Sequence, residues 1–186
     1  MMINSYSDYK RFRSIESTHG LVKGFLFPSE TERFLKWLRF FEFCFNRKGV
    51  WLLLLPLVYW KYRRVSLLTG ISIPKNTCGE GLTLYHFGSI VVNAACRIGR
   101  NCCIMINVNI GANGGSLKAP VIGDNVYIGP GAVIYGDIII ADGCYIGANA
   151  VVNKSFTEPN KVIVGVPAKE LKEDKVHWWE KNGIKR

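Results

Sequence analysis

The spacing of hydrophobic residues divides the chain into two parts at about Gly70. Before it, residues 29–46 carry large apolar side chains three and four positions apart, the spacing of one helix face. They are Phe34, Trp37, Leu38, Phe41 and Phe45. Ser29 can cap this helix, and Arg47-Lys48-Gly49 can end it. A second helix is expected over 50–68, closed by Gly70, whereas residues 1–28 show weak periodicity and predict a loosely structured lead-in.

After Gly70 an aliphatic residue recurs at every sixth position. The series reads Val92, Ile98, Ile104, Ile110, Ile122, Ile128, Ile134, Ile140, Ile146 and Val152. A small or medium residue follows four positions later in most hexads, and three of these are Cys96, Cys102 and Cys144. Internal repeats of six residues predict a parallel β-helix, in which each hexad supplies a short strand and a turn. Stacked coils bury the aliphatic side chains in one core, and we expect the three cysteines there as compact hydrophobes.

Two interruptions of the repeat mark where functional residues are expected, because sites tend to be built on loops of a rigid scaffold. Leu84 and Val92 are eight positions apart instead of six, which places two inserted residues around Ile90 and Val91. Between Ile110 and Ile122 the segment ANGGSLKAP (112–120) lacks an aliphatic strand. This segment is expected to leave the body of the β-helix as a loop.

The most apolar segment, VWLLLLPLVYW (50–60), is too short to span a membrane. It has eleven residues where about 20 are needed, and Pro56 interrupts it. We expect a buried helix packed on its neighbours. The alternative is an interfacial helix whose basic flank (Lys61, Arg63 and Arg64) touches anionic lipid, which implies a peripheral membrane contact.

Net charge and cysteine content narrow the function classes. The 186 residues carry a formal charge of +10, but residues 1–70 hold 12 basic side chains against 5 acidic ones and account for most of it. The repeat segment lacks a basic stripe interleaved with exposed aromatics, so no nucleic-acid partner is expected. With no secretory signal evident, the six cysteines predict reduced thiols and a cytoplasmic protein. A three-histidine zinc site needs more than the single histidine of the repeat, and no metal is expected.

His86 is the only histidine inside the repeat, and it stands beside the eight-residue irregularity. A turn histidine that caps a backbone carbonyl is the structural alternative to a functional one. The motifs HFGSIVVN (86–93), IGRNC (98–102), IGDNVYIGPGAVI (122–134) and VIVGVPAKEL (162–171), with the Gly-rich loop, resemble those of hexapeptide-repeat acyltransferases. The resemblance covers about residues 70–172 and points to serine acetyltransferases and the related sugar O-acetyltransferases of polysaccharide biosynthesis.

That resemblance implies a left-handed parallel β-helix, a homotrimer or a dimer of trimers, and active sites in clefts between neighbouring prisms. It places His86 on the catalytic histidine, as the general base that deprotonates an acceptor hydroxyl beside the thioester of acetyl-CoA; an imidazole suits this because its pKa lies near neutrality. The coenzyme is a co-substrate here. By the same resemblance, Ala112, Pro130 and Ala148 face its pantetheine arm, and Lys154 and Lys161 are the candidates for its phosphates.

Three positions depart from the serine acetyltransferases. Tyr85 replaces the Asp before the catalytic histidine, Ile71 replaces an upstream Asp that orients the imidazole, and Ala119 replaces a second His in the loop. Since the lost groups would hold a zwitterionic amino acid, we predict a sugar or saccharide hydroxyl as acceptor, with Tyr85 in the acceptor pocket and a role in surface polysaccharide biosynthesis. Serine O-acetylation for cysteine biosynthesis is the alternative, and a non-catalytic β-helix scaffold is the second.

Three segments are expected from these patterns. Residues 1–70 form an N-terminal helical segment, residues 71–169 the left-handed β-helix acyltransferase domain, and residues 170–186 a C-terminal tail with a short helix. The tail is expected to dock on a neighbouring coil or subunit, and a peripheral membrane contact is the alternative for it as for residues 50–60. The predicted localisation is therefore cytoplasmic, with a peripheral position at the inner face of the membrane as the alternative.

Overall fold

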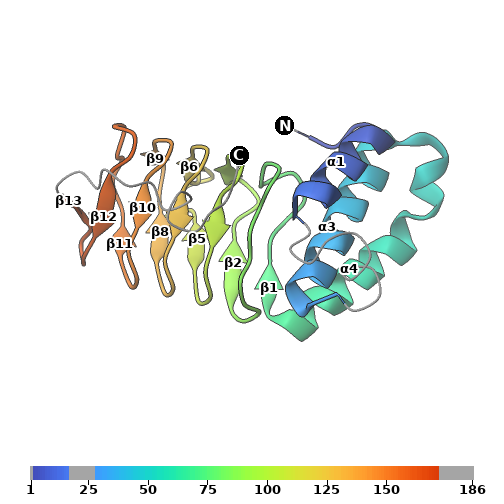
Figure 1. Cartoon of the computed structure of the whole chain (residues 1–186), viewed down its shortest axis with the longest axis horizontal. Coiled ribbons are helices and arrows are strands. Elements are labelled where there is room, and N and C mark those ends of the chain that lie inside the picture. Colours follow the sequence, from blue (N-terminus) through green and yellow to red (C-terminus); the bar gives the residue numbers. More distant parts are fainter. Residues whose placement is uncertain (1, 17–27, 172–186) are drawn as a thin grey trace.

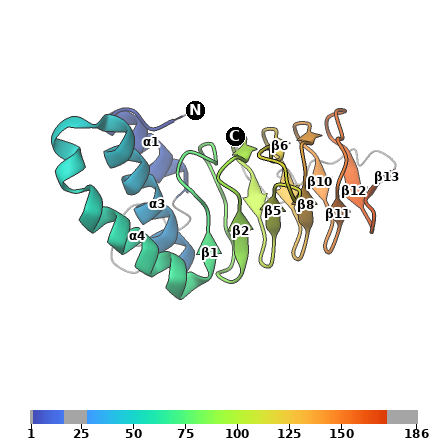
Figure 2. The same ribbon diagram turned by 180° about the vertical axis from the view of Figure 1, so that it is seen from behind.

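The computed structural model describes residues 2–16 and 28–171. Helices gather at one end and stacked short strands form the rest of an elongated molecule, as Figure 1 shows, and the view from behind in Figure 2 gives the same arrangement. The predicted mainly β fold class, a left-handed parallel β-helix preceded by helices, is confirmed. The expected C-terminal helix falls outside the described residues.

The helical end consists of α1 (Tyr6–Glu16), α3 (Glu30–Arg47), the 3₁₀ turn η1 (Gly49–Leu53) and α4 (Leu55–Thr69). Helix α3 agrees with the prediction to within a residue, and Ser29 and Glu32 form a reciprocal capping box at its start. The second predicted helix starts later than expected, because Pro56 occupies the first turn of α4 and the preceding residues form η1. Gly70 ends α4 in a left-handed conformation, with φ of 72°.

The prediction of a loosely structured lead-in over residues 1–28 is wrong for α1. Its periodicity is weak because few of its residues face the core; Phe12 is its fully buried aromatic residue. A capping pair supports its start, since the amide of Asp8 donates to the Ser5 hydroxyl (3.0 Å) and the amide of Ser5 donates to the Asp8 carboxylate (3.0 Å). Contacts with distant residues, described below, hold its other end.

The strands form three sheets, which are the faces of a triangular prism. Within each face, strands of successive coils pair in parallel and in register. The first face contains β1 (Ile71–Ser72), β2 (Ile90–Val92), β5 (Asn109–Gly111), β8 (Val133–Tyr135) and β11 (Val151–Val152). The second contains β3 (Arg97–Ile98), β6 (Val121–Ile122) and β9 (Ile139–Ile140). The third contains β4 (Cys103–Ile104), β7 (Tyr127–Ile128), β10 (Tyr145–Ile146), β12 (Val162–Val164) and the antiparallel β13 (Lys169–Leu171).

The six-residue series forms the interior of this prism. All ten aliphatic residues of the series are buried, and Cys96, Cys102 and Cys144 are buried with them, as predicted. The turns between faces use left-handed residues where the chain bends most sharply, among them Asn101, Asn125 and Gly143. Gly129 shows how closely the coils approach, because a Cβ there would lie 2.8 Å from the backbone of Gly147. Any larger residue at position 129 would push two coils apart.

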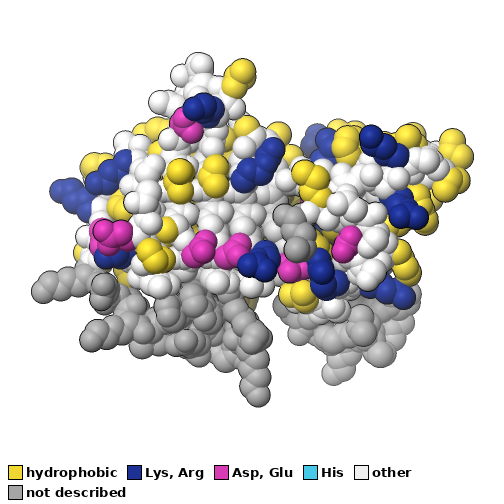
Figure 3. Space-filling view, turned by 90° about the horizontal axis from the view of Figure 1, so that it is seen from above, with side chains coloured by type: hydrophobic (Ala, Val, Ile, Leu, Met, Phe, Trp, Pro, Cys, Tyr) yellow, Lys and Arg dark blue, Asp and Glu magenta, His cyan; other side chains and the backbone are white. Residues whose placement is uncertain are grey.

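The two interruptions of the repeat have different structures: one is a projecting loop and the other is an enlarged turn. The segment 112–120 leaves the coil as a loop, as predicted, with the Leu117 side chain 96% exposed and Lys118 paired with Asp137 at 2.8 Å. Figure 3 shows this projection rising from the flank of the β-helix. The inserted residues near Val92 were predicted in the wrong place. Ile90 and Val91 belong to β2, and the extra residues lie in the turn 85–89, which replaces an ordinary corner of the prism.

A buried ionic cluster joins the helices to the first coil. The guanidinium of Arg39 is fully buried and donates to Glu16 at 2.7 Å and to Glu42 at 2.9 Å. It also donates to the backbone carbonyls of Cys78 (3.0 Å) and Gly79 (2.6 Å) in the first coil. The two carboxylates hold the pKa of Arg39 above its usual value despite burial, so its charge is retained. One side chain of α3 thus links α1, α3 and the prism.

The prediction that residues 50–60 form a buried helix is wrong. Val50, Leu53, Leu57 and Trp60 are exposed, with Leu53 at 80%, so this segment faces outward from the helical end. Within the described parts of the chain, no helix combines the length and the apolar character that crossing a membrane requires.

Candidate functional site

The candidate site lies along the prism edge between the third and first faces. The strand register aligns Leu84, Ile104, Ile128 and Ile146 as inward residues of successive coils, and the corner residues that follow them stack in the same order. His86 stands at this edge in the first coil, Pro130 in the third and Ala148 in the fourth. The structure thus brings the predicted base and two of the three predicted pantetheine residues onto one edge.

Helix α4 positions the turn that carries His86. The amide of Gly88 donates to the carbonyl of Thr69 at 2.8 Å, and the amide of Ile90 donates to the carbonyl of Gly70 at 3.2 Å. A side chain at Gly70 would meet the backbone of Gly88 at 3.1 Å, so both the left-handed cap and the close approach favour glycine. The end of α4 therefore holds the turn 85–89 by two backbone hydrogen bonds, one within the turn and one at the start of β2.

The imidazole of His86 is exposed to solvent, and no described residue forms a hydrogen bond with it. Tyr85 and Phe87 beside it are also exposed, at 47% and 58%. The side chain is therefore free to meet a substrate, or a group from another subunit. The structural alternative, a histidine that caps a backbone carbonyl, finds no support among the described contacts.

Residues of the third face form an aromatic surface beside this edge. The rings of Tyr127 and Tyr145 stack at 4.5 Å with an interplanar angle of 6°. Burial, then the neighbouring Tyr145, raises the pKa of Tyr127 to about 12, and burial raises the pKa of the Cys103 thiol to about 12. Burial also raises the pKa of Tyr85, with Cys103 as the further contributor. Tyr85 and Tyr127 therefore stay protonated near pH 7 and can offer hydroxyl donors and ring faces, whereas the neutral Cys103 thiol is buried.

The sequence analysis did not identify this tyrosine pair, although the positions of the two residues in the repeat indicate it. Tyr127 and Tyr145 each come directly before an inward isoleucine of the repeat, so strand alternation places both side chains on the outside of the same face. Because the two positions are 18 residues apart, one full coil, they stack. Reading the outward positions coil by coil would have found them.

The other predicted coenzyme residues lie elsewhere. Ala112 follows β5 and stands at the base of the projecting loop, on the edge between the first and second faces, and Lys154 lies near the same edge in the last full coil. Lys154 is exposed, with its ammonium 5.4 Å from the ring of Phe156. Lys161 differs, because its ammonium pairs with Glu158 at 2.9 Å and with Glu170 at 2.6 Å. Those two carboxylates already neutralise Lys161, which makes it the weaker phosphate ligand of the two.

Two of the three departures from the serine acetyltransferase pattern leave apolar residues where polar ones were expected. Ile71 is fully buried in β1 and Ala119 is 6% exposed at the end of the loop, so neither offers a polar group. Within the described ranges no group of three or more histidine, cysteine or acidic side chains could hold a metal ion. The site consists of one exposed imidazole, tyrosine hydroxyls and backbone groups of the prism edge.

Part of the chain is similar in sequence to known proteins. The family model "Bacterial transferase hexapeptide (six repeats)" matches residues 119–154. The serine acetyltransferase of Staphylococcus xylosus is 39% identical over 109 residues, which cover 57% of this chain and 50% of that protein. The serine acetyltransferase of Buchnera aphidicola is 35% identical over 116 residues, covering 60% and 44%. The chain therefore spans about half the length of the curated relatives that it matches.

Solved structures extend the likeness to the helical end. The serine acetyltransferase of Neisseria gonorrhoeae in complex with serine superposes with a TM-score of 0.68 at 25% identity, over 90% of this chain and 70% of that one. A serine acetyltransferase in complex with CoA has the same fold, with a TM-score of 0.70 at 21% identity. Because these relatives and structures are serine acetyltransferases, the predicted saccharide acceptor and role in polysaccharide biosynthesis are wrong, and the serine alternative is favoured. The resemblance of this chain to the hexapeptide-repeat acyltransferases, on their serine acetyltransferase branch, is confirmed.

Proposed function

We propose that the protein transfers an acetyl group from acetyl-CoA to the hydroxyl of serine. The observation that carries this proposal is the exposed imidazole of His86 on a hexapeptide-repeat prism whose relatives are serine acetyltransferases. The solved complexes with serine and with CoA support both substrates. No metal enters the proposal, since proton transfer and positioning are sufficient for this reaction.

His86 acts as general base. One imidazole nitrogen accepts the proton of the serine hydroxyl, and the oxygen attacks the carbonyl carbon of the thioester. The C–S bond then breaks, the imidazolium returns the proton to the departing sulfur, and O-acetylserine and CoA are the products. Tyr85 adjoins the base at the same turn, and we assign it to the acceptor pocket, where its hydroxyl stays protonated and can donate a hydrogen bond.

The separation of the predicted residues over two prism edges favours an assembly. His86, Pro130 and Ala148 share one edge, whereas Ala112, Lys154 and the projecting loop belong to another. Two edges of one prism cannot close on the same substrate, but an edge of one copy can face a different edge of a neighbour. We therefore propose a homotrimer with sites between prisms, which light scattering should report as three times the chain mass of 20.9 kDa. A dimer of trimers would double that value.

The direct test is release of free CoA from acetyl-CoA on addition of L-serine. Substitution His86→Ala should reduce kcat by about 10²–10⁴-fold, the range for loss of a positioned base. Ser89→Ala, an exposed residue of the same turn, is the matched control and should keep most of the activity. Full activity in His86→Ala would remove the assigned base, and no serine-dependent CoA release from the wild type would reject the proposed reaction.

The setting of the reaction is also part of the proposal. All six cysteines are free and buried, as expected of a reducing compartment, so we place the protein in the cytoplasm. Oxidising treatment of the folded protein should leave the thiols unchanged, because their side chains do not reach solvent.

A further inference from the structure

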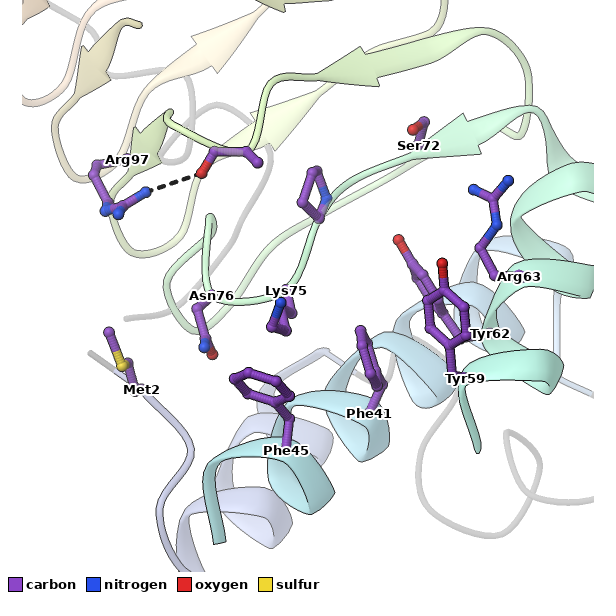
Figure 4. A pocket seen from close by; sticks show the side chains of 12 residues that line it. Met2, Phe41, Phe45, Tyr59, Tyr62, Arg63, Ser72, Lys75, Asn76 and Arg97 are labelled. Carbon is purple, nitrogen blue, oxygen red and sulfur yellow. Dashed lines mark hydrogen bonds between the residues drawn. The ribbon is translucent and has the colours of Figure 1, made fainter. Parts of the chain in front are cut away.

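Two adjoining cavities lie where the helices meet the first coil, away from the edge that carries His86. The larger holds about 530 Å³, and Figure 4 shows it between α3, α4 and the start of the β-helix. The smaller holds about 340 Å³ and is bounded by apolar residues of η1 and α4. Both volumes are in the range of sites for small molecules. The rings of Phe41, Phe45 and Tyr59 border both cavities, so the two share a wall.

The larger cavity is cationic. Arg63, Lys75 and Arg97 line it, and no acidic side chain is among the described residues on its wall. Lys75 stands 4.2 Å from the ring centroid of Phe45, and Figure 4 places Arg63 on the α4 side and Arg97 on the β-helix side. The described part of the chain offers none of the three a carboxylate partner within ion-pair distance. Glu42, behind the wall, is already paired with Arg39.

Two backbone carbonyls orient the side chain of Arg97. Its Nη1 donates to the backbone carbonyls of Ala94 (3.2 Å) and Cys96 (2.7 Å), which orients the guanidinium without neutralising it. The remaining nitrogens keep their hydrogen-bonding capacity. Planar guanidinium groups and an ammonium arranged around one space suit a phosphate or carboxylate.

The smaller cavity is apolar. Leu52, Leu55 and Pro56 line it together with the shared aromatic rings, and no charged side chain is among the described residues around it. A cationic chamber beside an apolar one matches a molecule with an anionic head and an aliphatic chain. Neither a free phosphate nor a neutral hydrocarbon would fill both.

We propose that these two cavities form a binding site for an anionic amphiphile. The head occupies the chamber of Arg63, Lys75 and Arg97, and the chain occupies the cleft of Leu52, Leu55 and Pro56. This site is independent of the proposed acetyl transfer, because it shares no residue with the edge of His86, Pro130 and Ala148.

The surrounding surface favours a bilayer as the source of that amphiphile. The sequence contains no acidic residue from Phe43 to Gly79, while it contains six basic ones there. The outer face of α4 exposes Leu57, Trp60, Leu67 and Leu68, and Lys61 and Arg64 stand over the Trp60 ring at 5.1 and 5.3 Å. A second copy of the chain would bring like charges together on this face. Exposed apolar residues with basic neighbours instead suit an anionic lipid surface.

Calorimetry with dodecyl phosphate below its micelle concentration tests the site directly. Inorganic phosphate lacks the chain, and dodecyl maltoside lacks the charge. We expect dodecyl phosphate to bind at least tenfold more tightly than either of them. Equal binding of dodecyl phosphate and dodecyl maltoside, or no binding of dodecyl phosphate, would overturn the proposal.

Neighbouring residues provide matched variants. Arg63→Gln removes a cation inside the chamber, and Arg64→Gln removes one from the outer face of the same helix. Leu52→Ser alters the apolar cleft, and Leu53→Ser alters an adjacent residue that is 80% exposed. Arg63→Gln and Leu52→Ser should each weaken dodecyl phosphate binding by about tenfold, as expected for loss of a charged hydrogen bond or of buried apolar contact. Equal losses in the control variants would contradict the assignment.

Vesicles identify the source of the amphiphile. Co-sedimentation with phosphatidylglycerol vesicles but not with pure phosphatidylcholine vesicles, weakened by Arg64→Gln and Leu53→Ser, supports the proposal with a bilayer as the source. Binding of monomeric dodecyl phosphate without vesicle binding supports it with a soluble amphiphile. Light scattering that shows a second copy on this face, with dodecyl phosphate excluded from the assembled protein, would overturn it.

Discussion

The helical end and the β-helix are stabilised in different ways. From Cys78 to Leu171 the described buried side chains are all apolar, and each coil is held by the coils next to it. The helical end and its junction instead bury Glu16, Glu32, Arg39 and Glu42. A repeat needs only one local rule applied many times, whereas the helices, which share its apolar core, add a few buried polar contacts between distant residues.

The candidate site lies where these two regions meet. The turn 85–89 exists because the first coil departs from the hexad rule, and its backbone bonds to the end of α4. The regular coils supply the edge along which Pro130 and Ala148 align, and the irregular turn supplies the imidazole. Substitutions in one region or the other should therefore separate effects on the stability of the fold from effects on the position of the His86 imidazole.

The largest effect is expected for Arg39→Ala. Removing the guanidinium leaves the buried carboxylates of Glu16 and Glu42 without their cationic partner, which should lower the free energy of unfolding by about 3–5 kcal/mol. Arg100→Ala is the control in the β-helix, since Arg100 pairs with Asp124 at 2.7 Å on the surface and its loss should change stability little. Denaturant unfolding measures both, and equal losses would remove the distinction between the regions.

A smaller loss is expected within the β-helix core. Ile128 is fully buried at the centre of the series, and Ile128→Ala should cost about 2–4 kcal/mol in free energy of unfolding through lost packing and a cavity. Ile139→Ala changes the same residue type on the outside, where the side chain is 53% exposed, and should cost less than about 1 kcal/mol. If thermal unfolding shows the two variants to be equally stable, the inward assignment of the series is wrong.

The smallest effect concerns the start of α1 and depends on pH. Hydrogen bonds from Ser5, first its hydroxyl, and from the Asn4 amide hold the pKa of Asp8 below its usual value. Because the folded state lowers this pKa, the stabilisation is present above the ordinary pKa of about 3.9 and is lost as the pH falls through the folded value. Asp8→Asn should lower the melting temperature slightly at pH 7 and leave it unchanged at pH 2.5. The control Asp137→Asn, between β8 and β9, should not affect the helical signal.

Much of the fold could be predicted from the sequence, and the reasons differ by element. Helix α3 was found because capping residues and a helical period agree over 18 residues. Helix α1 was missed because its stability comes from Arg39 and Leu82, which are 23 and 66 residues away from Glu16. The exposure of residues 50–60 was also missed, since hydrophobicity alone does not say whether a neighbour covers a segment.

The candidate site was predictable only in part, for similar reasons. His86 stood out as the histidine beside the break in register, yet the inserted residues lie before Ile90 rather than around it. The ion pairs of Lys161 with Glu158 and Glu170 depend on how the chain turns between β12 and β13. The acceptor was misjudged because three lost polar residues were given more weight than the likeness of the remaining chain to serine acetyltransferases.

By itself, the sequence determined the coiled prism and the loop at 112–120, because strand alternation and a six-residue period fix which side chains face inward at each coil. Only the tertiary structure decided which edge carries His86, how Arg39 joins three elements, and that a cationic chamber lies beside an apolar cleft. These features arise between residues far apart in the chain, and no local periodicity records such contacts.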